Sequence, residues 1–130
     1  MTHRALVLLI VLGLGLLACG EDDNGSEADR RGVGAQCASA DDCTEEGQAC
    51  LTTFKGGYCG VQDCDADADC PAGSGCVNHD DGNNYCFLIC AAKDDCNVNR
   101  DEANASNCSS SATFIEVAGT RKACVPPSGG

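Results

Sequence analysis

Twelve cysteines repeat in a regular pattern between Cys37 and Cys124, and this pattern limits what the chain can fold into. They form three consecutive sets of four, with five residues between the first and second cysteine of every set. The next two gaps are six and eight residues in the first set, five and nine in the second, and eleven and fifteen in the third. An aspartate immediately precedes the second cysteine each time, at Asp42, Asp69 and Asp95. The pattern predicts three tandem modules, of which the third is expanded.

Large apolar residues are too few for burial alone to fold the chain. Of the 112 residues that follow residue 18, only 15 are Val, Leu, Ile, Phe or Tyr. Highly charged chains with less than about 20% of such residues usually stay disordered, so cross-links must reduce the entropy of the unfolded chain. Disulfides at this density require an oxidising compartment. We therefore expect a small disulfide-rich fold with little regular secondary structure.

Each module is expected to combine a tight loop with a short β-hairpin. Turn signals flanked by strand-forming residues lie between the third and fourth cysteines, at Gly56-Gly57, Asp81-Gly82 and Gly119. Glycine supplies the positive φ that tight hairpin turns need. In the third module the expected hairpin joins residues 112–117 to residues 121–125.

Spacing alone does not fix which cysteines pair, but hairpin geometry favours one arrangement. A turn at Asp81-Gly82 would put Cys76 and Cys86 on opposite faces of the hairpin, where they could not bridge. Pairing the first cysteine with the second would leave the hairpin untied. First-to-third and second-to-fourth pairing is therefore predicted, giving Cys37–Cys50, Cys43–Cys59, Cys64–Cys76, Cys70–Cys86, Cys90–Cys108 and Cys96–Cys124.

The cysteine pattern also resembles that of a known family. From Cys64 to Cys90 it is C-x5-C-x5-C-x9-C-x3-C with Asp before the second cysteine, which resembles the N-terminal cysteine-rich region of Dickkopf proteins. It is also similar to cysteine-rich repeats of bacterial surface lipoproteins. The resemblance extends from Cys37 to about Cys90, and the longer gaps of the third module depart from it. It implies a disulfide-rich module, and the signalling function of Dickkopf proteins is not transferred.

The first 18 residues predict an export signal. Arg4 is followed by an apolar run from Ala5 to Leu17, interrupted only by Gly13 and Gly15. This length suits the apolar part of a signal peptide and is too short to span a bilayer comfortably.

The end of this run, Leu16-Leu17-Ala18-Cys19, resembles the lipobox of bacterial lipoproteins. The resemblance implies that Cys19 becomes the first residue of the mature chain and carries diacylglycerol on sulfur and an acyl chain on its amine. Two or more acyl chains give stable anchoring. The alternative is an ordinary signal peptide whose Cys19 joins a disulfide, but assigning Cys19 to lipid leaves an even twelve of the 13 cysteines. Position 20 is Gly and not the Asp that retains many such lipoproteins at the inner membrane. The resemblance therefore implies an anchor in the outer membrane of a Gram-negative-type bacterium, with the protein exposed to the periplasm or the cell surface.

These observations divide the chain into six parts. They are a lipoprotein signal peptide (1–18), a flexible acidic tether (19–36), three cysteine-rich repeats (37–63, 64–89 and 90–125) and a tail (126–130).

The charge of the chain restricts its partners. The formal net charge is −12, which disfavours nucleic acid and anionic lipid headgroups and suits a cation or a basic partner. Asp65, Asp67 and Asp69 alternate and are weak candidates for calcium, but Cys70 and Cys76 stand where an EF-hand needs Gly and Glu. In the alternative interpretation Asp69 caps a helical turn in an exposed acidic loop. Paired C-x2-C zinc knuckles are absent, so no metal or other cofactor is predicted.

Catalysis has little support in the sequence. His79 is the only histidine after residue 18, and it stands beside Asp80 in an expected exposed turn with no nucleophile motif. We therefore expect a non-enzymatic protein, anchored in the membrane by lipid, that binds an unknown protein or polymer or serves a structural role. The alternatives are a small protease inhibitor with Lys55 as its bait residue, and a calcium-dependent surface module.

Overall fold

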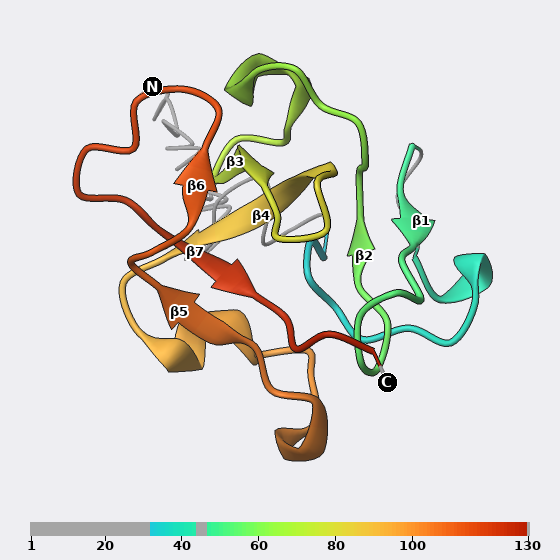
Figure 1. Ribbon diagram of the computed structural model, residues 1–130. Coiled ribbons are helices and arrows are strands. Elements are labelled where there is room, and N and C mark those ends of the chain that lie inside the picture. The colour runs from blue at the N-terminus through green and yellow to red at the C-terminus, as the bar shows by residue number, and fades with distance from the viewer. Residues whose placement is uncertain (1–31, 44–46, 130) are drawn as a thin grey trace, which may run out of the picture.

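The computed structural model describes residues 32–43 and 47–129, which form short strands and single helical turns (Figure 1). Over these residues there is no α-helix, and no helix is long and apolar enough to cross a membrane. The predicted small disulfide-rich fold is confirmed. Its elements are η1 (Ala40–Asp42), β1 (Ala49–Cys50), β2 (Cys59–Gly60), η2 (Asp67–Asp69), β3 (Ser74–Asn78), β4 (Asn84–Cys90), η3 (Lys93–Cys96), η4 (Glu102–Asn104), β5 (Asn107–Ser109), β6 (Thr113–Phe114) and β7 (Lys122–Val125).

Six disulfides hold these elements together. Each module joins its first cysteine to its third and its second to its fourth, which is the arrangement expected from the sequence. The pairs are Cys37–Cys50, Cys43–Cys59, Cys64–Cys76, Cys70–Cys86, Cys90–Cys108 and Cys96–Cys124.

The expected placement of Cys76 and Cys86 on opposite faces of the hairpin is nevertheless wrong. Cys76 lies directly opposite Cys86 in the β3–β4 hairpin, not on the other face. The backbone N–H of His79 donates to the carbonyl of Asn83 at 2.8 Å, so the connection holds three residues where a two-residue turn was assumed. That extra residue shifts the register by one, and a one-residue shift moves a side chain to the other face.

The same register recurs in the other modules, where Cys50 faces Cys59 and Cys108 faces Cys124. In every module the third and fourth cysteines therefore share one face of a pair of antiparallel strands. From that face the third cysteine bonds to the first cysteine, which precedes the helical turn. The fourth cysteine bonds to the second, which lies at the end of the turn.

That turn is closed by the aspartate before the second cysteine. The carboxylate of Asp69 accepts backbone hydrogen bonds from Asp65 at 2.9 Å and Ala66 at 3.0 Å. Asp42 and Asp95 accept the equivalent pairs of bonds in the other two modules. The interpretation of Asp69 as a cap is therefore confirmed, and it extends to all three repeats.

The second and third modules merge into one sheet with the strand order β5-β7-β4-β3-β6 (Figure 1). Strand β7 pairs with both β5 and β4, whereas β6 pairs with β3, placing Phe114 opposite Val77. The expected hairpin between residues 112–117 and 121–125 is therefore wrong. The fifteen-residue gap before Cys124 is long enough for residues 113–114 to reach the free edge of β3.

The few large apolar residues gather in one core that all three modules share. Phe54 and Tyr58 from the first module meet Tyr85 and Phe87 from β4, and Phe114 of β6 joins the same cluster. The ring centroids of Phe54 and Tyr85 lie 5.1 Å apart, and those of Tyr58 and Phe87 lie 5.4 Å apart. A small number of aromatic side chains thus serves the whole molecule, because each contributes a large buried area.

Both flanking segments also pack on the first module, so its expected limits were too narrow. Cys59 receives a backbone hydrogen bond from Gly34 at 2.9 Å and donates one to Ala35 at 3.0 Å. Residues 32–36 of the expected tether thus belong to the fold, whereas residues 19–31 lie outside the described part. At the other end, Gly129 donates to the carbonyl of Thr53 at 2.8 Å, so the expected tail returns to the first module (Figure 1).

Candidate functional site

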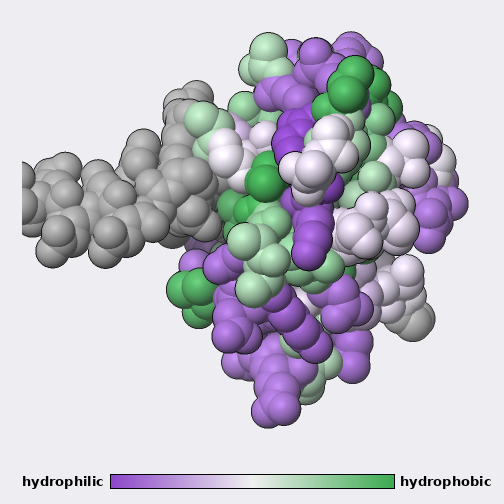
Figure 2. Space-filling view, turned by 90° about the vertical axis from the view of Figure 1, so that its left-hand side faces the viewer, coloured by the Kyte–Doolittle hydropathy of each residue, from purple (hydrophilic) through white to green (hydrophobic). Residues whose placement is uncertain are grey.

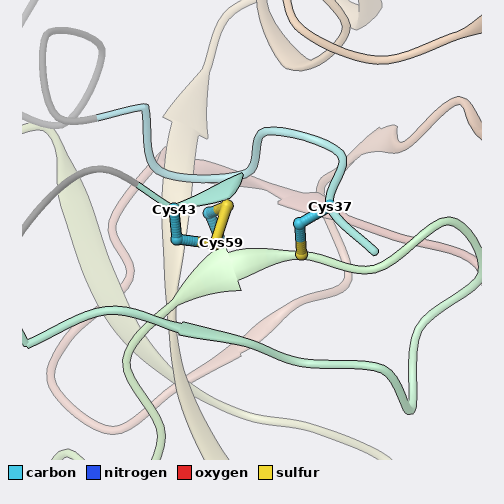
Figure 3. Close-up of side chains that lie close together, drawn as sticks. All are labelled: Cys37, Cys43 and Cys59. Carbon is cyan, nitrogen blue, oxygen red and sulfur yellow. A yellow bond between two sulfur atoms is a disulfide. The ribbon is translucent and has the colours of Figure 1, made fainter. Parts of the chain in front are cut away.

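The cysteine sulfurs gather in one place in each module. The sulfurs of the first, second and fourth cysteines lie within 4.8 Å of one another in all three modules. Figure 3 draws the first of these clusters, made by Cys37, Cys43 and Cys59. All of these sulfurs belong to disulfides, whereas metal binding requires thiolates. The clusters therefore serve as cross-links between turn and hairpin.

The three calcium candidates are not brought together as ligands. Asp69 uses its carboxylate to cap its turn. Asp67 accepts a bond from the backbone N–H of Cys76 at 2.9 Å, and its other oxygen lies 2.8 Å from the guanidinium of Arg121. In the described part of the chain no three carboxylate or imidazole groups converge, so the structure does not bring Asp65, Asp67 and Asp69 together as ligands.

These contacts also affect the pKa of Asp67. Partial burial raises the pKa of this carboxyl, but the hydrogen bonds from Cys76 and Arg121 and the positive charge of Arg121 outweigh it and hold the pKa below its usual value. Asp67 is therefore an anchor for Arg121, and Arg121 in turn packs over the ring of Phe114 at 4.3 Å.

Lys55 does not have the backbone that a bait residue needs. Its side chain is exposed, but its N–H donates to Pro127 at 2.9 Å and its carbonyl accepts from Arg100 at 2.7 Å. A segment that binds a protease as an added strand must offer free main-chain groups. Both main-chain groups of Lys55 are already used within the protein.

An open recess of about 520 Å³ is formed where three parts of the chain meet. The first module contributes Thr53 and Phe54, the β3–β4 turn contributes residues 79–81, and the C-terminal segment contributes Ser128 and Gly129. An isolated antiparallel bridge between Phe54 and Ser128 holds the C-terminal wall in place.

Aromatic rings form the base of the recess. Phe54 is 3% exposed, and its ring centroid lies 5.3 Å from that of His79 in an edge-to-face contact. His79 also packs against Tyr85 and Phe87. It is therefore a half-buried wall residue, and the expectation of an exposed turn residue is wrong.

Carboxylates line the rim. The hydroxyl of Tyr85 donates to Asp81 at 2.7 Å, and the backbone N–H of Asn83 donates to the other carboxylate oxygen at 2.9 Å. Burial raises the pKa of Asp81, but the hydrogen bonds from Tyr85 and Asn83 outweigh it and leave the pKa below its usual value. Burial and the bond to Asp81 raise the pKa of Tyr85, so at neutral pH Asp81 on the rim is anionic and the buried Tyr85 behind it is neutral.

In the described part of the chain, the contacts of the His79 ring are edge-to-face contacts with Phe54, Tyr85 and Phe87. The sequence showed His79 beside Asp80, but no pattern in it indicated that residues 53–54 and 128–129 would meet them. That meeting depends on contacts between segments far apart in the chain.

Cys19, the predicted lipidation site, lies outside the described residues. Comparison of the chain with protein-family models, with curated proteins and with solved structures found no match.

Proposed function

We propose that this protein is a non-enzymatic lipoprotein of a bacterial outer membrane. In this proposal Cys19 carries the acyl chains, and the disulfide-stabilised module of residues 32–129 binds a protein or polymer at the membrane surface. The observation that carries the proposal is the pairing of the cysteines. All twelve from Cys37 to Cys124 bond to one another, so Cys19 has no partner for a disulfide within the chain.

The lipobox-like Leu16-Leu17-Ala18-Cys19 gives this single cysteine a chemical role. Sulfur and amine together can carry more than one acyl chain, which makes attachment stable. Residues 20–31 separate the anchor from the first described residue and can extend at most about 40 Å.

Binding is supported by the cross-linked construction of the module. Its loops are fixed by six disulfides, so they lose little conformational entropy when a ligand is bound. The recess beside His79 offers such a ligand a preformed concave surface.

Fatty-acid labelling tests the anchor directly. The full chain would be expressed in a Gram-negative bacterium supplied with an alkyne fatty acid, alongside the variants Cys19→Ser and, as a control in the same segment, Ser26→Ala. We expect the wild type and Ser26→Ala to carry label and to fractionate with the outer membrane, and Cys19→Ser to carry none. An unlabelled wild type, or label retained in Cys19→Ser, would contradict lipidation at this residue.

A further inference from the structure

We infer that the recess beside His79 binds a lysine or arginine side chain presented by a basic segment of a protein partner. The inference rests on the proposed role of residues 32–129 as a binding module, and it assigns the chemistry of the ligand. It depends on three properties of the recess, namely its unpaired charge, its apolar base and its position on an acidic molecule.

Among the described residues, no lysine or arginine forms an ion pair with the carboxylates at the rim. Asp80 and Asp81 are both exposed, and across the described ranges the one lysine or arginine within 4.0 Å of a carboxylate is Arg121, which binds Asp67. The buried Arg100 is held by carbonyl oxygens and does not reach this rim. Both carboxylates thus lack a lysine or arginine partner in the described part of the chain and can pair with a cation supplied from outside.

The recess matches the two-part character of a long basic side chain. Phe54 at the base provides an apolar contact for the methylene stem, and Asp80 and Asp81 stand at the rim for the charged end. Lysine and arginine side chains bury their stems and keep their charged groups near water in this way. The hydroxyl of Tyr85 and the N–H of Asn83 hold both oxygens of Asp81, so one of the two acceptors is already oriented.

Other occupants fit the recess less well. An anion would be repelled by the carboxylates at the rim and by the net charge of −12 on the whole chain. An apolar ligand would remove water from Asp80 and Asp81 without replacing it by hydrogen bonds, which is unfavourable. A basic protein segment is favoured because the acidic surface around the recess also attracts its other charges and accelerates encounter.

The test uses the oxidised full chain in detergent micelles and a fluorescent Gly-Ser peptide that contains three lysines. Matched peptides carry norleucine or glutamate in place of lysine. The protein variants are Asp80→Asn at the rim, Ser128→Trp to fill the recess, and Asp94→Asn as a control that removes the same charge from the exposed face of η3. Binding is followed by fluorescence anisotropy at low and physiological salt, and melting temperatures show that each variant is folded.

Asp80→Asn removes one exposed charge pair and should weaken binding of the lysine peptide by up to about fivefold. The control Asp94→Asn should weaken binding by less than about twofold. Ser128→Trp should weaken it further than Asp80→Asn, and the norleucine and glutamate peptides should not bind. Equal effects of Asp80→Asn and Asp94→Asn would overturn the inference in favour of general charge attraction. Binding of the norleucine peptide, full binding by Ser128→Trp, or no binding of the lysine peptide to the wild type would each overturn it as well. None of these outcomes alters the labelling of Cys19, so the two proposals fail separately.

Discussion

A single aspartate caps the helical turn at the start of each module. Asp42, Asp69 and Asp95 each accept two backbone N–H groups from the residues three and four positions earlier, and so close a one-turn 3-10 helix. Short polar side chains favour such positions because they satisfy N–H groups that the helix itself leaves without a partner. The second cysteine follows immediately, so the capped turn directs its sulfur toward the hairpin.

The capping bonds predict a pH dependence of stability. Backbone N–H donors hold the pKa of two capping carboxyls below the ordinary value. For Asp42 the donors are Ala38, with the larger effect, and Ser39. For Asp95 they are Ala92, with the larger effect, and Ala91. A lowered pKa in the folded state contributes stability above the unfolded value of about pH 4, and this contribution is lost as pH falls through the folded pKa. We expect the urea midpoint to fall less between neutral and acidic pH in the double variant Asp42→Asn/Asp95→Asn than in the wild type.

The neighbours Asp41 and Asp94 provide the control, because their carboxylates accept none of these capping bonds. The double variant Asp41→Asn/Asp94→Asn should keep the wild-type difference between the two pH values. If both double variants respond alike, the acid sensitivity comes from overall charge and not from the caps.

At the scale of the element, the repeating unit is a pair of antiparallel strands tied to a helical turn. The third and fourth cysteines lie opposite each other on these two strands, and each bonds to a cysteine beside the turn. Each cross-link closes a chain segment of 12 to 28 residues. Closing such loops removes conformations from the unfolded chain, which in the chain-entropy model stabilises the fold by about 3 kcal/mol or more for each bridge. Sheet formation can therefore succeed with strands only two residues long in the first module.

Two hairpin glycines with the same backbone preference should differ strongly in their tolerance of a side chain. Gly57 has φ of 71°, and a Cβ there would overlap the carbonyl oxygen of Cys37, whereas Gly82 has φ of 85° and open space around it. Gly82→Ala should cost only the left-handed strain of about 1 kcal/mol. Gly57→Ala should prevent correct closure of the first module.

The two variants are compared by thiol titration after oxidative refolding and by urea denaturation of the oxidised fraction. We expect more free thiols in Gly57→Ala than in the wild type, and the wild-type number in Gly82→Ala. Complete oxidation and wild-type stability of Gly57→Ala would show that the first module can move away from the glycine at little cost.

As a whole molecule, the three modules form one body. A shared aromatic core, the five-stranded sheet and the docked C-terminal segment all join parts that are far apart in sequence. On the face drawn in Figure 2, strongly hydrophobic residues form only small separate groups, in keeping with the concentration of aromatic side chains inside. Independent modules on a string would have left these rings exposed.

Arg100 is the buried polar link between the third module and the first. It is 8% exposed and donates to the carbonyls of Gly34 at 3.1 Å, Gly57 at 2.6 Å, Lys55 at 2.7 Å and Asn104 at 2.9 Å. Its replacement leaves buried carbonyl groups without a donor, and each such group costs about 1 to 3 kcal/mol. We expect Arg100→Met to lower the free energy of unfolding by at least about 2 kcal/mol.

Urea denaturation with intact disulfides measures this loss, and hydrogen exchange should show faster exchange at residues 34–36 than at β4. Lys93→Met removes a cation from an exposed position and should change stability by less than about 0.5 kcal/mol. A loss in Arg100→Met no larger than that in Lys93→Met would show that the first and third modules are joined by other contacts.

Local order could be predicted from the sequence because it depends on residues close together in the chain. The cysteine spacing and the repeated aspartate predict three disulfide-tied modules, and the position of Asp69 directly before the second cysteine suits the cap of a helical turn. The disulfide pairs were also those predicted. However, one additional residue in the turn after His79 places Cys76 and Cys86 on the same face of the hairpin, where opposite faces were expected. Register depends on turn length in this way, and the Asp-Gly signal fits both a two-residue and a three-residue connection.

Only the tertiary structure decided how the modules meet. Phe114 reaches the edge of β3 because a long connection and an open strand edge happen to coincide, and Ser128 reaches Phe54 through backbone pairing that any residue could provide. Backbone hydrogen bonds carry little sequence information, so these contacts leave no pattern to read. The recess beside His79 is built from such contacts. The sequence by itself determined how each module is tied together, and the packing between modules determined where the molecule has a surface suited to a ligand.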